Sequence, residues 1–196
     1  MSDSKIRLAA NQIAAFDEFV AEFGQETDRA AVLLGGAKLD DVLLRILAQF
    51  LIPNATSRDE FLEAEGPLST FSARINATYR LGIIDADFAR SLHLVRKIRN
   101  DFAHEIAGAK LDWGKHRDRI TALCSAIAKT DIFREVKRSY FDGKEGTRGD
   151  FLTCLVILVA RLEGIYQKTQ CLIVMKPYGI IPKSYDSKQA GKSVKK

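Results

Sequence analysis

The strongest constraint on the fold is the spacing of apolar residues, which recur three and four positions apart along almost the whole chain. This spacing gathers apolar side chains on one face of a helix. A half-buried strand needs strict alternation of apolar and polar residues instead, and such alternation is nearly absent. The sequence therefore predicts an all-α fold, a compact helical bundle of about six helices.

Capping residues and helix breakers set the limits of the expected helices. Thr27 precedes a long periodic segment that stops at Pro53, and Asp85 precedes another that continues to about Ile106. Pro67 suits the first position of the helix between them, which ends at Gly82. The expected helices cover residues 9–23, 27–52, 67–82, 85–106, 112–129 and 150–170, with a shorter segment at 132–140.

The net charge of +5 is concentrated at one end of the chain. Residues 176–196 contain six lysines and a single acid, Asp186, whereas residues 1–175 carry 24 basic and 24 acidic side chains. We therefore predict a helical domain at 1–175 and a basic, disordered tail at 176–196. A neutral body argues against an extended basic groove for nucleic acid.

Cys124, Cys154 and Cys171 form no C-x-x-C pair, and each lies in or beside an apolar helical segment. This pattern favours buried free thiols in a cytoplasmic protein. The three histidines are far from the cysteines in sequence, so we expect no zinc site and no cofactor. The most apolar segment, 152–160, is too short to cross a bilayer, and we expect no signal peptide.

The segment RKIRNDFAH, residues 96–104, places a cation on an apolar helix face. At about 100° per residue, Arg99 falls in the middle of a stripe of apolar side chains. An isolated guanidinium in an apolar core is strongly unfavourable, so Arg99 has to be paired, hydrogen-bonded or turned toward a cavity or partner. The stripe consists of Phe88, Leu92, Val95, Phe102 and Ile106.

Two interpretations of Arg99 stay open. In the first, Arg99 forms a buried ion pair with Asp40, an acid that lies inside the apolar arc of the 27–52 helix; other acids, or carbonyls of residues 63–67, could take its place. In the second, Arg99 faces a cleft at a surface or dimer interface. A polar stripe flanks Arg99 and consists of His93, Arg96, Asn100 and His104. Of these residues, Arg96 and His93 are the candidate binding residues.

Other unusual residues receive structural interpretations. We expect His93 and His116 on the surface. Trp113, alone in a loop, is expected to pack against the end of the bundle and not to bind a base. A third interpretation, in which Arg99 and His104 serve only the fold, is also open.

The same segment resembles the R-x4-6-H motif of HEPN domains, all-α modules that include metal-independent ribonucleases. Arg99, Asn100 and His104 match that motif residue by residue. In that family the motif lies at a dimer interface, where two copies line one RNA cleft. The resemblance implies that His104 would move the proton of a ribose 2′-OH while Arg99 stabilises the phosphate, which suits an imidazole and a forked cation.

Residues 65–84, EGPLSTFSARINATYRLGII, are similar to the central segment of the mannitol operon repressor family, which shows a GPL…S.R…Y.LG.I pattern there. That family is all-helical, has no obvious DNA-reading helix and acts through protein partners. The resemblance implies a transcriptional regulator that works by protein–protein contacts. The matching positions are Gly66, Pro67, Leu68, Ser72, Arg74, Tyr79, Leu81, Gly82 and Ile84.

This chain departs from the better-known repressors in having the Arg99–Asn100 pair together with His104. Two functional classes therefore stay open. The first is a regulator with a protein partner, and the alternative is a metal-independent endoribonuclease. We also expect a homodimer built partly on the 85–106 helix, because the HEPN-like resemblance places the polar stripe near a two-fold axis.

Overall fold

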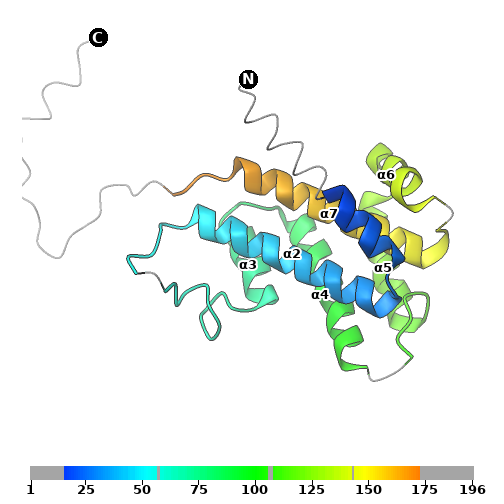
Figure 1. Cartoon of the computed structure of the whole chain (residues 1–196), viewed down its shortest axis with the longest axis horizontal. Coiled ribbons are helices and arrows are strands. Elements are labelled where there is room, and N and C mark those ends of the chain that lie inside the picture. The colour runs from blue at the N-terminus through cyan, green and yellow to red at the C-terminus, as the bar shows by residue number, and fades with distance from the viewer. Residues whose placement is uncertain (1–15, 57, 106–107, 143, 173–196) are drawn as a thin grey trace, which may run out of the picture.

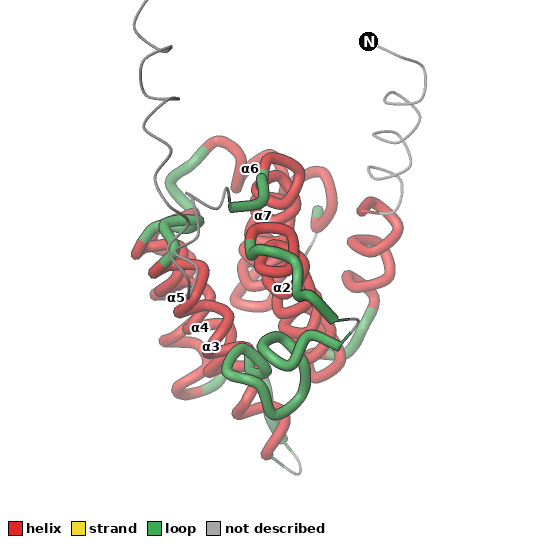
Figure 2. Tube along the Cα trace, turned by 90° about the vertical axis from the view of Figure 1, so that its left-hand side faces the viewer, coloured by secondary structure: helices red, strands yellow, loops and turns green. Residues whose placement is uncertain are grey.

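The computed structural model describes residues 16–56, 58–105, 108–142 and 144–172. Their regular secondary structure is entirely helical, which confirms the all-α prediction (Figures 1 and 2). The predicted tail at 176–196 and the first residues of the predicted 9–23 helix lie outside the described residues. A helix covers 16–25, followed by α2 (Asp28–Phe50), α3 (Phe71–Arg80), α4 (Ala86–His104), α5 (Gly114–Ile127), α6 (Asp131–Phe141) and α7 (Gly146–Lys168).

Helices α2 and α7 run side by side through the centre of the molecule (Figure 1). The segment 151–159 of α7 is buried at every position, because its apolar residues cover the whole circumference of the helix. Helices α3, α4 and α5 lie on one side of this pair and the 16–25 helix on the other (Figure 2). Gly35 permits the close approach of α2 to α7, since a Cβ at this position would lie 2.6 Å from Leu155 Cδ1 of α7.

Two of the predicted caps are confirmed. The Thr27 hydroxyl accepts from the Ala30 N–H at 3.3 Å, and the Asp85 carboxylate accepts from the Phe88 N–H at 2.8 Å. These bonds satisfy helix-start donors that would otherwise lack a partner.

The predicted start of the third helix at Pro67 is wrong, because α3 begins four residues later with Thr70 as its cap. The chain turns tightly at Gly66, where a Cβ would lie 2.1 Å from the Glu60 carbonyl oxygen. The turn folds the loop back over α2 and α3. Loop residues Leu62 and Leu68 are buried there against Leu47.

Three further predictions need correction. Trp113 is 75% exposed, and Leu111 fills the end of the bundle instead. His116 is buried, with its ring 4.8 Å from the ring of Phe102. Cys171 is exposed, although Cys124 and Cys154 are buried as expected. No described helix is long and apolar enough to span a membrane.

Candidate functional site

Helix α4 carries all the candidate site residues except Asp40. Arg99 and His104 are exposed, whereas His93, Arg96 and Asn100 are partly buried. The face of α4 that enters the core consists of Ala89, Ser91, Leu92, Val95, Ile98 and Phe102. The centre of this buried face lies nearer to Ile98 than the centre of the apolar stripe predicted from the sequence. Arg99 therefore lies at the edge of the buried face and not in its middle.

Arg99 meets α2 at Gly36. A Cβ on Gly36 would lie 2.9 Å from Arg99 Cγ, so the methylene stem of Arg99 packs against bare helix backbone. The stem is covered and the charged end reaches solvent, which is how long cationic side chains commonly lie on apolar surfaces. The guanidinium donates to Asn100 Oδ1 at 3.2 Å.

The predicted ion pair between Arg99 and Asp40 is wrong. Asp40 Oδ1 accepts from Arg74 Nη1 at 2.7 Å, and these side chains are 26% and 12% exposed. Arg74 Nε also donates to the Leu68 carbonyl at 2.9 Å. Arg74, one of the positions that match the repressor pattern, thus connects α2, α3 and the preceding loop.

The other end of the α2–α4 contact is held by Arg29 of α2. Its guanidinium donates to the carbonyls of Phe102 and Glu105, at the C-terminal end of α4. A cation at this position satisfies carbonyls that have no partner within the helix and complements the helix dipole. His104 is therefore exposed at the end of a helix that is firmly fixed to its neighbour.

His93 lies one turn before Arg96 and Lys97 on α4, and its Nε2 is 3.0 Å from Asn76 Oδ1 of α3. Burial and, after it, the positive charges of Arg96 and Lys97 lower the pKa of His93. Among the described residues, no carboxylate forms an ion pair with Arg96, Lys97 or Arg99. The three cations lie on different sides of α4, since Lys97 is about 160° around the helix from Arg99.

The structure also contains a polar cluster between α4 and α5 that sequence reasoning missed. Asp101 Oδ2 lies 3.0 Å from Lys115 Nζ and 3.4 Å from His116 Nε2, and it accepts a hydrogen bond from Arg119. Burial raises the pKa of Asp101, but the hydrogen bonds from Lys115 and Arg119 outweigh it and lower the pKa overall. His116 Nδ1 donates to the Lys110 carbonyl at 3.0 Å, because a carbonyl oxygen can only accept.

This cluster joins two helices across a loop. Its only sign in the sequence is the regular spacing of polar residues along each of the two segments that form α4 and α5. All its charges are paired, which marks it as a structural link. In the part of the chain that the structure describes, no group of three or more His, Cys, Asp or Glu residues is placed to hold a metal ion.

Comparisons with known proteins identify a fold. No family model matches the sequence, and no curated protein matches it. Among solved structures, the chain is similar to MtlR in the X-ray structure of the MtlR–HPr complex from Escherichia coli, with a TM-score of 0.54. The two are 19% identical over 76% of this chain and 98% of that chain. The chain thus has the MtlR fold, as the resemblance of residues 65–84 predicted.

Proposed function

We propose that this chain is a regulatory protein of the mannitol operon repressor kind, which acts by binding another protein. The observation that carries the proposal is the fold likeness, which spans 98% of MtlR, a protein solved in complex with HPr. The repressor-like pattern of residues 65–84 and the electrically neutral body of the chain support the same conclusion. HPr, or a protein like it, is the partner that this proposal names.

Light scattering on the purified full chain, alone and mixed with HPr, tests this proposal. We expect a complex whose mass exceeds that of either component. If only the two separate masses are seen at tens of micromolar, the proposal is refuted. A transient regulatory contact still has a dissociation constant of roughly micromolar order, so its complex would be populated at that concentration.

A metal-independent endoribonuclease is the second candidate, and the exposure of Arg99 and His104 on α4 favours it over a purely structural role. Asn100 links the two, since it accepts from Arg99 and lies one helical turn before His104. The homodimer belongs with this candidate, because two copies of α4 would combine two such sets. Cleavage of single-stranded RNA in the presence of EDTA, lost in both Arg99→Ala and His104→Ala, would establish it.

A further inference from the structure

Two cysteines from different helices bring their sulfur atoms into contact inside the bundle. Cys124 of α5 and Cys154 of α7 are 30 residues apart in sequence, and their Sγ atoms are 3.1 Å apart. Both thiols are free. A disulfide bond is about 2.0 Å long, so a shift of roughly 1 Å would bring the two sulfur atoms to bonding distance. The fold therefore places this pair of thiols where a bond between them can form.

The two thiols differ in their access to solvent. Cys154 belongs to the segment 151–159 of α7, which is buried at every position. Cys124 is 8% exposed and lies at the edge of the buried face of α5. At about 100° per residue, the buried Ile120 lies on one side of Cys124 and the exposed Thr121 on the other. A small oxidant that comes from solvent therefore reaches Cys124 before Cys154.

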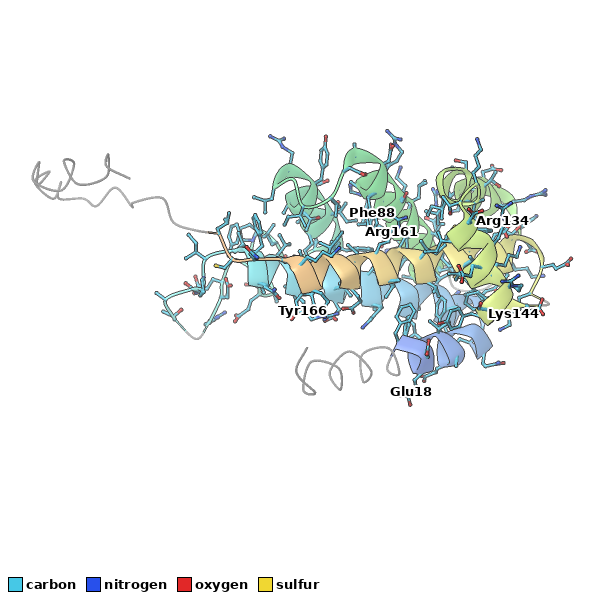
Figure 3. The ribbon with its side chains drawn as sticks, turned by 90° about the horizontal axis from the view of Figure 1, so that it is seen from above. Glu18, Phe88, Arg134, Lys144, Arg161 and Tyr166 are labelled. Carbon is cyan, nitrogen blue, oxygen red and sulfur yellow. The ribbon has the colours of Figure 1, made fainter. Side chains whose placement is uncertain are left out.

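The third thiol lies too far away to take part in this contact. Cys171 is exposed and follows the C-terminal end of α7. Figure 3 shows the length of α7, which runs from beside Lys144 to beyond Tyr166. Cys154 is about 21 Å along the helix from the last residue of α7. Cys171 can thus form a disulfide only with another molecule.

We propose that Cys124 and Cys154 form a reversible disulfide that links α5 to α7 when the protein meets a peroxide. A small thiol reductant breaks the bond again by thiol–disulfide exchange. The pair is thus a site of oxidative modification in the helical body. This inference is independent of the proposed function, because it concerns contacts within one chain.

The reaction balances in two steps. In the first step, the sulfur of the Cys124 thiolate attacks one oxygen of hydrogen peroxide, the O–O bond breaks, and a sulfenic acid and hydroxide form. The hydroxide becomes water with the proton that the Cys124 thiol has released. In the second step, the Cys154 sulfur attacks the Cys124 sulfur, the S–O bond breaks, and the Cys154 proton leaves with the hydroxyl group as water. Two thiols are oxidised to one disulfide, and one peroxide is reduced to two waters.

The contact between the sulfur atoms decides which product forms. A sulfenic acid either condenses with a thiol or is oxidised further to a sulfinic acid by a second peroxide. Reacting atoms that are held about 3–3.5 Å apart have a large advantage over a reactant that arrives from solution. Cys154 is held at this distance from Cys124. The disulfide is therefore the expected product, and the sulfinic acid is not.

Peptide mass spectrometry of the full chain tests this site, with Cys171→Ser introduced to remove the exposed thiol. The folded protein is treated with hydrogen peroxide, its remaining thiols are alkylated, and it is digested without reductant. We expect a linked pair of peptides that contain Cys124 and Cys154, in a protein that remains a single chain and keeps its helical circular dichroism spectrum. Dithiothreitol should restore both thiols.

The variant Cys154→Ser in the same Cys171→Ser background is the matched control. It keeps Cys124 but removes its partner, so Cys124 should proceed to the sulfinic acid and no linked pair should form. The position of Cys124 in the unmodified chain should be oxidised to the disulfide under the same conditions. This difference separates a reactive pair from a single accessible thiol.

Three results would overturn the proposal. The first is recovery of both thiols in the reduced form, at peroxide concentrations that oxidise Cys171 in the unmodified chain. The second is conversion of Cys124 to the sulfinic acid while Cys154 is present, since the two sulfur atoms would then not be in contact. The third is a linked pair that appears only together with loss of the helical spectrum, which would place bond formation in the unfolded chain.

Discussion

Arg99 of α4 packs directly against Gly36 of α2, with the Arg99 stem lying where a Gly36 side chain would be. A glycine in the middle of a helix normally destabilises it by about 1 kcal/mol relative to alanine. The absence of a side chain at Gly36 therefore makes room for the stem of Arg99.

The size of the Gly36→Ala effect should depend on Arg99. In the unmodified chain, the new methyl group meets Arg99 Cγ at 2.9 Å and the substitution should destabilise the fold. In an Arg99→Ala background the contact with Cγ disappears and only the 3.3 Å contact with the Cβ of residue 99 remains, so Gly36→Ala should be less destabilising by about 1 kcal/mol. Urea denaturation of the four proteins measures the coupling, and an equal effect in both backgrounds would contradict the described contact.

Arg74→Ala should destabilise the fold more than Arg99→Ala. Removing Arg74 leaves the partly buried Asp40 carboxylate and the Leu68 carbonyl without their donor, at a cost of about 1–3 kcal/mol. Arg99→Ala removes an exposed charge and the packing of its stem, at a cost of roughly 0.5–1 kcal/mol. Chemical denaturation compares the two directly, and a larger loss for Arg99→Ala would restore the buried-arginine interpretation.

Two levels of structure differ in how far the sequence predicts them. The caps at Thr27 and Asp85 depend on neighbouring residues, and so they can be read from local sequence. The position of Arg99 depends on which neighbouring helix covers each side of α4, and the apolar spacing of one helix does not contain this information. The ion pair of Asp40 could not be predicted for the same reason: its partner is Arg74 of α3 and not Arg99 of α4.

The loop between α4 and α5 gives a second example. Its path decides that Leu111 and His116 are buried while Trp113 is exposed. Residue type alone predicts that Leu111 is buried, but it does not separate Trp113 from His116, since both are intermediate in their tendency to be buried. The Leu111 N–H binds Asp28 Oδ2 at 3.3 Å, and this contact with the distant start of α2 helps to fix the loop.

The pKa of His93 should rise when its cationic neighbours are removed. Burial is the main cause of its lowered pKa, with Arg96 and Lys97 contributing after it. Replacing both by glutamine should raise the pKa only part of the way to its ordinary value, since burial remains. NMR titration of the imidazole measures this change, with Arg161→Gln as a control that should have no effect. An unchanged pKa in the double variant would show that the charges of Arg96 and Lys97 do not act on His93.

Asp101 should make stability depend on acid pH. Its folded-state pKa lies below the ordinary value of 3.8, so the unfolded chain binds the proton more readily than the folded chain. The stabilisation is complete above that value and is lost as pH falls through the folded-state pKa. Asp101→Asn should therefore cost more stability at pH 7 than at pH 3, as measured by denaturation at both values. An equal cost at both pH values would show that the carboxylate charge contributes nothing.

The three thiols should differ sharply in reactivity. Cys124 and Cys154 are buried, with their sulfur atoms 3.1 Å apart, whereas Cys171 is exposed. The hydrogen bond between Cys154 and Cys124 favours the neutral Cys154 thiol, and this bond and burial both raise the pKa of Cys154, so its reactive thiolate is scarce. A thiol-reactive reagent should label one cysteine rapidly in the folded chain and all three after denaturation. Rapid labelling of Cys154 in the folded chain would contradict this packing.

Hydrogen exchange of the full chain with and without HPr tests the central claim most directly, because it reports whether a protein partner binds. We predict slower amide exchange in a continuous surface segment of the helical body when HPr is present. Exchange that HPr alters nowhere in the chain would contradict the account.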